Sequence, residues 1–471
     1  MGNPDATENR PADPSGVSRG DEVRASVAAG IFAQPYRALS LGMVTLVALF
    51  VFETLAVATA MPTVARALDG LSLYALAFAG TLAVSVVGMV VAGRSADRRG
   101  PRAPLCQGLA WFGLGLVIAG LAPTMLVLVF GRILQGYGGG LMSVALYVVV
   151  GRVYPPALRA RIFAAFAAAY VLPAVVGPLV SGLIVQYTSW RWVFLSVPVV
   201  AVVAALMVLP ALRGIGPLEG KTAANTDRWR TFWAVGAAGG VLLLHYAGHR
   251  HGANVVPWLL LAVITLVVCT RRLLPPGSLH AAPGLPAVMA LRGLAAAAFF
   301  GTEVYLPLLL SRERGLSPAL AGIVLTLGAV GWSGGSWYRG RMCDPAPVRI
   351  LQVGQGLIAV GVVVVASAVW PVMPVTLAMT GWIVAGLGMG LAFPTLSVLT
   401  LELSPPELQG IHSSALQLSG SLATATVLAL GGSLFTVLVE RLPMLAYLSG
   451  FAVTTILAIA SVLLARRVQS A

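Results

Sequence analysis

Two carboxylates within long apolar runs are the side chains best placed to carry chemistry. Glu53 lies in the outer part of the run 41–61, and Glu303 lies in the run 286–310. An ionised carboxylate in a membrane-spanning segment costs about 3 kcal/mol or more, so it normally faces a polar interior, pairs with a cation or titrates. The residue type and its setting therefore predict proton uptake and release. The alternative is a neutral carboxyl group bonded to a neighbouring backbone carbonyl.

Arg132 is the cation that the sequence places nearest to these carboxylates. It shares one helical face with Gln135, Gly136 and further small residues. Counted from the expected span ends at about 1.5 Å per residue, Glu53, Arg132 and Glu303 lie within roughly 3 Å of a common depth. We therefore expect Arg132 to act on a carboxylate. A structural arginine bonded only to backbone carbonyls is the alternative.

Long apolar helices must position these charges. The chain has 471 residues, of which 58% are hydrophobic and only 10% are charged. No soluble domain of this length has such a composition, so we expect an all-α, multi-pass membrane protein. Apolar runs bounded by Pro, Gly and charged residues predict fourteen spans, at 39–62, 73–93, 103–122, 125–150, 160–186, 192–212, 230–247, 254–270, 286–310, 316–338, 349–370, 374–400, 410–437 and 443–465.

The basic residues indicate how the chain is oriented in the membrane. The net charge is +14, and most Lys and Arg residues lie in the N-terminal tail and in short loops on the same side. This asymmetry follows the positive-inside rule, so we expect both termini in the cytoplasm and no nucleic-acid partner. Residues 1–37 are polar and predict a disordered tail. Arg292 lies within a span, and we expect its side chain to snorkel to the inner surface.

Enzyme and metal chemistry are not indicated. Cys106, Cys269 and Cys343 lie in spans or in a cytoplasmic loop, which argues against a disulfide framework. His249 and His251 lie in a short outer loop with no Cys or acidic residue nearby, and they predict a solvated turn. The sequence contains no phosphate-binding glycine loop, nucleophile elbow or metalloprotease helix, so we expect no catalytic residues, no metal and no bound cofactor.

The two halves of the chain repeat at an offset of 250 residues. The matched pairs are Gly136 and Gly386, Gly138 and Gly388, Gly140 and Gly390, Pro155 and Pro405, and Glu53 and Glu303. An ordered series at one offset indicates two six-helix units in the same orientation, with room for two more helices between them. We expect a tail at 1–37, a first bundle at 38–213, a linker with two extra helices at 214–285, a second bundle at 286–467 and a tail at 468–471.

A charged loop follows the second span. We expect Gly93 to allow close helix approach, and Asp97 to accept hydrogen bonds from a helix N-terminus or from an arginine of the other half. Arg98 and Arg102 follow on either side of Gly100, and we expect them to anchor the loop at the anionic inner surface. A basic loop that serves only membrane topology is the alternative.

The fifth span carries Gly177, Pro178 and Gly182. A Gly-Pro pair within a span bends the helix and opens a face for close packing. An ordinary proline kink is the alternative.

These motifs together resemble the major facilitator superfamily over nearly all of residues 38–467. The loop from Gly93 to Arg102 is similar to that family's loop between helices 2 and 3. The run that begins at Arg132 is similar to its helix 4 motif, which is associated with proton coupling, and the Gly177-Pro178 run is similar to the helix 5 signature of its antiporters. The nearest likeness is to the fourteen-span drug:proton antiporters. It implies two six-helix bundles plus two additional central transmembrane helices.

The resemblance also implies a function. It implies a plasma-membrane transporter, expected to be monomeric, that exports hydrophobic or cationic small molecules by alternating access and takes its energy from the proton gradient. On this hypothesis Glu53 or Glu303 carries the proton, Arg132 modulates it, and substrate and proton favour different states. Two alternatives remain open, namely a dedicated exporter of an endogenous metabolite, siderophore or lipid, and a non-transporting membrane sensor.

Overall fold

Fourteen long helices make up the fold. The computed structural model describes residues 30–34, 36–213, 215–216, 226–248, 255–342, 346–405 and 408–469, and every regular element within them is helical. The predicted all-α fold with fourteen apolar spans is confirmed. The helices are α2 (Arg37–Ala67), α3 (Tyr74–Arg99), α4 (Arg102–Gly120), α5 (Met125–Val153), α6 (Pro156–Tyr187), α7 (Arg191–Val208), α8 (Thr226–Gly248), α9 (Val255–Leu273), α10 (Leu285–Arg312), α11 (Pro318–Arg341), α12 (Pro347–Ala366), α13 (Val375–Glu402), α14 (Gln409–Leu438) and α15 (Pro443–Leu464).

Local sequence signals explain where several helices begin. Helices α6, α10, α11, α12 and α15 have a proline in their first turn, where its missing N–H leaves no hydrogen bond unmade. The Ser317 side chain caps α11 by accepting from Leu320 N at 3.3 Å, and the Thr124 side chain caps α5 by accepting from Val127 N at 3.4 Å. Of the expected N-terminal tail, residues 1–29 lie outside the described part of the chain.

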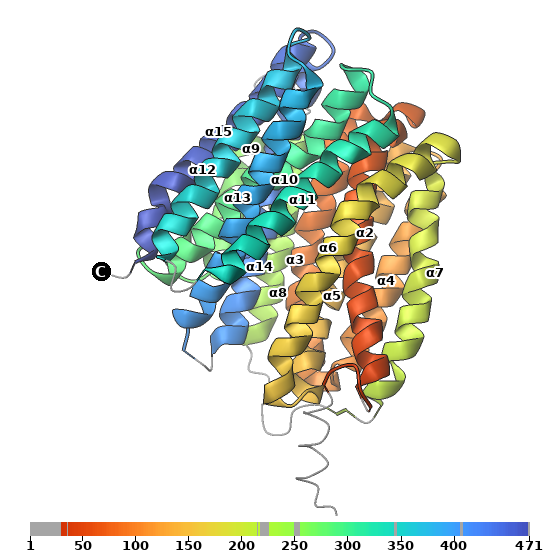
Figure 1. Ribbon diagram of the computed structural model, residues 1–471, viewed down its shortest axis with the longest axis vertical. Helices are drawn as coiled ribbons and strands as arrows, with labels where there is room; N and C mark the ends of the chain where they lie inside the picture. The colour runs from red at the N-terminus through yellow and green to blue at the C-terminus, as the bar shows by residue number, and fades with distance from the viewer. Residues whose placement is uncertain are drawn as a thin grey trace, which may run out of the picture.

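The helices form two bundles with the same internal arrangement (Figure 1). In the first bundle, α5 packs against α3 and α4, and α2 packs against α6 and α7. In the second bundle, α13 packs against α11 and α12, and α10 packs against α14 and α15. Because these are corresponding pairs in chain order, the internal repeat of the sequence is a repeat in space as well.

The repeated glycines perform the same packing task in both bundles. An added Cβ at Gly140 of α5 would lie 2.0 Å from the Ser85 carbonyl oxygen of α3, and one at Gly390 of α13 would lie 2.2 Å from the Trp332 carbonyl oxygen of α11. No side chain fits at such distances, so the two backbones are in direct contact. Small residues at a membrane helix interface allow this approach, which is why the glycines recur at one offset.

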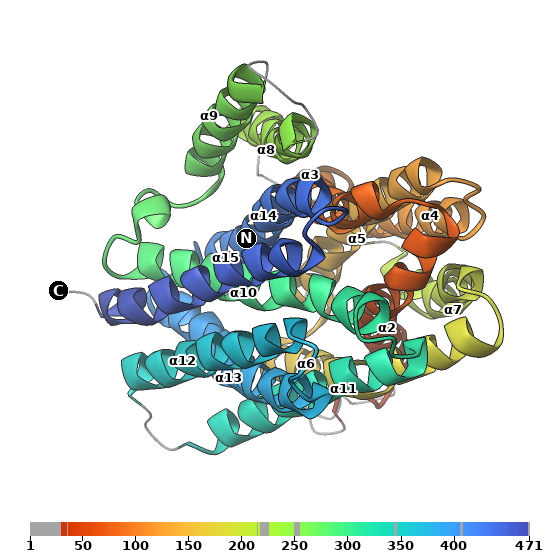
Figure 2. The ribbon, with the colours of Figure 1, turned by 90° about the horizontal axis from the view of Figure 1, so that it is seen from above.

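Helices α8 and α9 form a separate pair (Figure 2). They pack on each other, and α8 also contacts α3 of the first bundle and α14 of the second. Most of α9 is exposed, as expected for a helix that faces lipid. The two extra helices are therefore central in the chain and peripheral in space.

The bundles meet along two lines, α3 against α14 and α6 against α11. We call the face of the molecule at which α2 begins the near face and the opposite one the far face. At the far face, Tyr74 Oη of α3 donates to the Val304 carbonyl oxygen of α10 at 2.7 Å. An added Cβ at Gly432 of α14 would lie 2.3 Å from the Ala75 Cβ of α3. The first line of contact is thus tightest at the far face.

The glycine contacts predict a position-specific loss of stability. Gly386→Ala places a Cβ 2.0 Å from the Gly328 carbonyl oxygen, so the substitution should lower the free energy of unfolding by about 1–3 kcal/mol. Gly356→Ala is the matched control, because no atom of a neighbouring residue lies within 4 Å of its Cβ. Thermal unfolding of the purified protein in detergent compares the two variants, and an equal effect of both would contradict the backbone contact.

Candidate functional site

An ion pair joins Glu53 of α2 to Arg132 of α5. Arg132 Nη1 donates to Glu53 Oε1 at 2.5 Å and to Gln135 Oε1 at 2.5 Å. Both charged side chains are buried, with 2% of Glu53 and 4% of Arg132 exposed. Each charge needs the other, because a single buried charge in apolar surroundings is uncompensated. The structure thus brings together two of the three charges that the sequence places at a common depth.

Contacts from α3 and α6 hold this pair in place. Gly136 of α5 lies against α3, where its added Cβ would be 2.2 Å from the Thr81 carbonyl oxygen. Thr81 Oγ1 in turn donates to the Arg132 carbonyl oxygen at 3.1 Å. On the other side, Ser181 Oγ of α6 donates to the Ala56 carbonyl oxygen of α2 at 2.6 Å, one helical turn from the carboxylate. Both helices that supply the ion pair are therefore fixed by their neighbours.

Glu303 of α10 occupies the matching position in the second bundle and has no counter-ion. It is 7% exposed, and among the described residues no hydrogen bond or ion pair joins it. The position that matches Arg132 holds Trp382, which stacks on Phe299 with ring centroids 4.4 Å apart. The two carboxylates are thus related by the repeat, but only the first is paired.

Pro178 and Gly182 of the fifth span lie where the bundles meet. An added Cβ at Gly182 of α6 would lie 2.6 Å from the Pro318 carbonyl oxygen, and one at Gly322 of α11 would lie 2.3 Å from the Pro178 carbonyl oxygen. Gly177 faces α2, where its Cβ would be 3.4 Å from a phenylalanine ring. The close-packing face that the Gly-Pro pair predicts is therefore observed, and it joins the two halves near the far face.

The loop between α3 and α4 depends on a different glycine from the one expected. A Cβ at Gly93 would meet no atom of a neighbouring residue within 4 Å, so the prediction that Gly93 allows close helix approach is wrong. Gly100 is the constrained residue, with φ of 80° and an added Cβ that would lie 2.4 Å from the Ile215 carbonyl oxygen. A positive φ favours glycine, and the nearby carbonyl excludes a side chain.

The charges of this loop are only partly described. The Asp97 side chain lies outside the described part of the structure, so the prediction of its partners stays untested. Arg98 and Arg102 are exposed at the near face. Arg152, which the sequence analysis did not single out, donates to the Ala96 carbonyl oxygen at 3.0 Å and to the Gly216 carbonyl oxygen at 3.1 Å. Its place in the last turn of α5 beside the basic loops was the only signal for this role.

Arg292 of α10 does not snorkel. Its side chain is 9% exposed, and its guanidinium carbon lies 3.5 Å from the centre of the Phe393 ring of α13. The expectation that it extends to the inner surface is wrong, because aromatic and polar neighbours within the bundle hold it instead.

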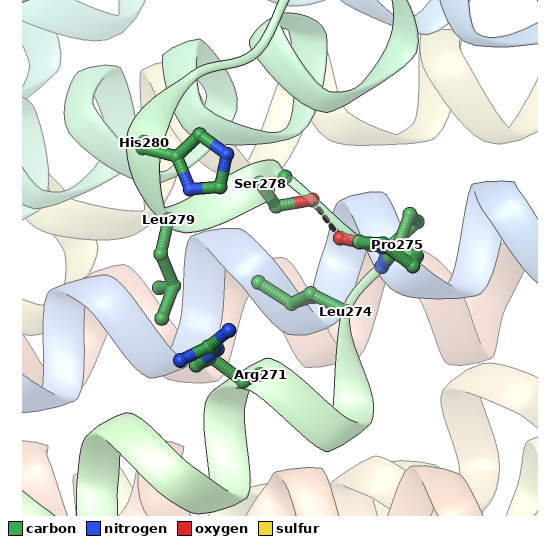
Figure 3. Close-up of a pocket in the computed structure, with 8 residues that line it drawn as sticks. Arg271, Leu274, Pro275, Ser278, Leu279 and His280 are labelled. Atoms are coloured by element: carbon green, nitrogen blue, oxygen red, sulfur yellow. Dashed lines mark hydrogen bonds between the residues drawn. The ribbon is translucent and has the colours of Figure 1, made fainter.

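A small cavity at the turn between α9 and α10 is separate from these charges (Figure 3). It has a volume of about 120 Å³ and is lined by residues 271 and 274–280. Ser278 Oγ donates to the Pro275 carbonyl oxygen beside it at 2.7 Å. Within the described residues, no group of three His, Cys, Asp or Glu side chains could hold a metal ion, and His249 and His251 lie outside them.

Comparison with known proteins identifies the family. The family model described as Major Facilitator Superfamily matches residues 41–428. The chain therefore belongs to the major facilitator superfamily, as its motifs predict, and it is a multi-pass membrane protein.

Relatives with assigned names include multidrug transporters. The chain is 28% identical over 378 residues to a probable multidrug-efflux transporter of Mycobacterium tuberculosis, covering 76% of this chain and 78% of the relative. It is 29% identical over 420 residues to a puromycin resistance protein of Streptomyces alboniger, covering 82% and 80%. A multidrug transporter protein of Bacillus subtilis is 34% identical over 166 residues, covering 35% and 31%.

Solved structures share the fold at low sequence identity. A transporter of the POT family, solved with a thioalcohol-conjugated peptide, has a TM-score of 0.69 at 15% identity and covers 95% of this chain and 100% of that one. A D-xylose-proton symporter has a TM-score of 0.64 at 16% identity and covers 91% and 96%. At these identities the likeness shows the arrangement of helices alone.

The buried ion pair predicts a characteristic double-mutant result. Glu53→Leu or Arg132→Met alone should lower the free energy of unfolding by about 3–5 kcal/mol, because each leaves one uncompensated charge. The double variant should recover most of this loss. Thermal unfolding in detergent completes the cycle, and losses that simply add would show that the two side chains do not depend on each other.

Proposed function

We propose that the chain is a proton-coupled antiporter that exports hydrophobic or cationic small molecules across the plasma membrane. The buried Glu53–Arg132 pair is the main observation behind the proposal. A charge pair is costly to keep among apolar helices, and its carboxylate is a defined site at which a proton can bind. The multidrug-efflux and puromycin-resistance relatives support export as the direction of transport. They also favour a drug exporter over a dedicated exporter of an endogenous metabolite, siderophore or lipid.

We propose that the near face is cytoplasmic and that both termini lie on that side. The concentration of basic residues in the loops of this face supports the orientation. The close contacts between the bundles, at Tyr74, Gly432 and Gly182, then lie toward the outside. On this proposal the described conformation is closed to the outside and takes up substrate from the cytoplasmic side.

The coupling step that we propose is a competition for the Glu53 carboxylate. A proton on Glu53 removes its negative charge, so the ion pair becomes a hydrogen bond from the cationic guanidinium of Arg132 to a neutral carboxyl group, which is a weaker interaction. Arg132 keeps its bond to Gln135 and is then free to change partner. When proton and substrate favour different arrangements of the two bundles, binding of one promotes release of the other.

Glu303 is the second group that we assign to coupling. Its carboxylate has no partner among the described residues, so it can accept a proton or a cationic group of the substrate without breaking an existing ion pair.

We also propose that the chain works as a monomer, uses no bound cofactor and releases its cargo chemically unchanged. The transmembrane proton gradient is then the source of energy.

Carboxylate variants in proteoliposomes test this proposal. Glu53→Gln, Glu303→Gln and the double variant should lose proton-driven ethidium transport, by about 5- to 150-fold if a typical coupling free energy is removed. Exchange of ethidium without a proton gradient should persist in at least one single variant, because only the coupling is lost. Transport is followed by ethidium fluorescence in vesicles that contain nucleic acid.

Glu440→Gln is the matched control, because Glu440 is exposed at the far face beyond the end of α14. It should transport like the unmodified chain. Fully proton-driven transport in both single variants and in the double variant would refute the assignment of coupling to these two carboxylates.

A further inference from the structure

A further buried charge lies between the bundles and is not used by the proposed coupling step. Arg292 of α10 is 9% exposed and packs against α13 and α14 of the second bundle. Its guanidinium lies over the Phe393 ring of α13 at 3.5 Å, and its Nη2 donates to Gln417 Oε1 of α14 at 3.3 Å. Gly420, one turn further along α14, lies beside the same side chain, because an added Cβ there would be 3.7 Å from Arg292 Nε, an ordinary contact distance.

No carboxylate in the described part of the chain compensates this arginine. Among the described residues, Arg292 forms no salt bridge, and its bond to Gln417 is the one hydrogen bond that it makes. Glu303 lies on the same face of α10 but eleven residues away, which is about 16 Å along the helix axis. A cation that is nine-tenths buried normally has a counter-ion, so this one has binding capacity left for an anion.

Two tyrosines of the first bundle face this cation from across the seam. The hydroxyl groups of Tyr147 of α5 and Tyr170 of α6 lie within electrostatic range of the Arg292 guanidinium. Both residues are about half exposed, at 49% and 50%, although they lie between the bundles. Accessible aromatic side chains therefore lie near the buried guanidinium.

We propose that Arg292 binds the anionic group of an amphiphilic aromatic substrate, with Tyr147, Tyr170 and Phe393 in contact with its apolar body. This inference rests on the proposed transport function and extends the cargo from hydrophobic and cationic compounds to anionic and zwitterionic ones. A guanidinium presents paired N–H donors that match a carboxylate, sulfonate or phosphate group. Aromatic rings on either side accept a planar apolar body.

Binding of two matched ligands tests the proposal. Naphthalene-2-sulfonate and its neutral sulfonamide share one aromatic body and differ in charge. The purified full chain in detergent should bind the sulfonate at least about tenfold more tightly, the minimum expected from a hydrogen bond to a charged group. Ligand-dependent shifts of the thermal unfolding midpoint give both affinities. Equal affinities would overturn the proposal.

Two variants separate binding from structure. Arg292→Gln removes the charge and should abolish the preference for the sulfonate. Gln417→Glu keeps the arginine but places a carboxylate at its hydrogen-bond partner, so it should abolish the same preference without leaving a buried group unpaired. Arg441→Gln is the control, because this exposed far-face arginine should not affect the preference. A preference that survives in either of the first two variants would contradict the assignment.

Transport of a cation distinguishes this inference from the function on which it rests. If the unmodified chain prefers the sulfonate but shows no proton-driven transport, the binding site stands and the antiporter proposal fails. If ethidium transport is intact and no preference is found, the antiporter stands and the anion site is refuted.

Discussion

The cost of burying charge among apolar helices is the constraint on which this structure depends. Glu53 and Arg132 compensate each other's charge: Arg132 Nη1 lies 2.5 Å from Glu53 Oε1, and both side chains are almost completely buried. The close contact of α5 with α3, where the backbones touch at Gly136, fixes the helix that carries Arg132. The small residues and the charged residue of α5 thus depend on each other: the glycines fix the position of the helix, and the helix places Arg132 beside Glu53. Substitution of a glycine on one face would move a charge on another.

The sequence predicts the spans and the repeat well, because both are local properties. Apolar run length determines where a helix crosses the membrane, and the structure has all fourteen. The glycines at a common offset mark positions of backbone contact in both bundles, since only glycine tolerates a neighbouring carbonyl oxygen about 2 Å from the place of a Cβ. The same spacing placed Glu53 opposite Glu303 in the repeat. It did not tell which of them has a partner.

The partners of the buried charges cannot be inferred from the repeat, because the matching positions of the two halves hold different residue types. Where the first bundle has Arg132 and Gln135, the second has Trp382 and Ala385, so its carboxylate has no cation. The prediction that Gly93 allows close packing in the loop after α3 was wrong for a similar reason. A segment distant in the sequence packs against Gly100, so Gly100 is the glycine that has no room for a side chain. The aromatic and polar neighbours of Arg292 come from α5, α6, α13 and α14, and no spacing along one helix indicates them.

Helix α8 makes the two sides of the molecule unequal. It contacts α3 and α14 together and so covers one of the two lines along which the bundles meet, whereas no additional helix among the described residues covers the α6–α11 line. Any rotation that separates α3 from α14 must also break the contact of α8 with one of them. An additional helix therefore resists the motion on one flank alone. In a transporter whose two bundles rock against each other, this difference favours separation at α6 and α11 over separation at α3 and α14. Lipid can also reach the interface between the bundles more readily along α6 and α11.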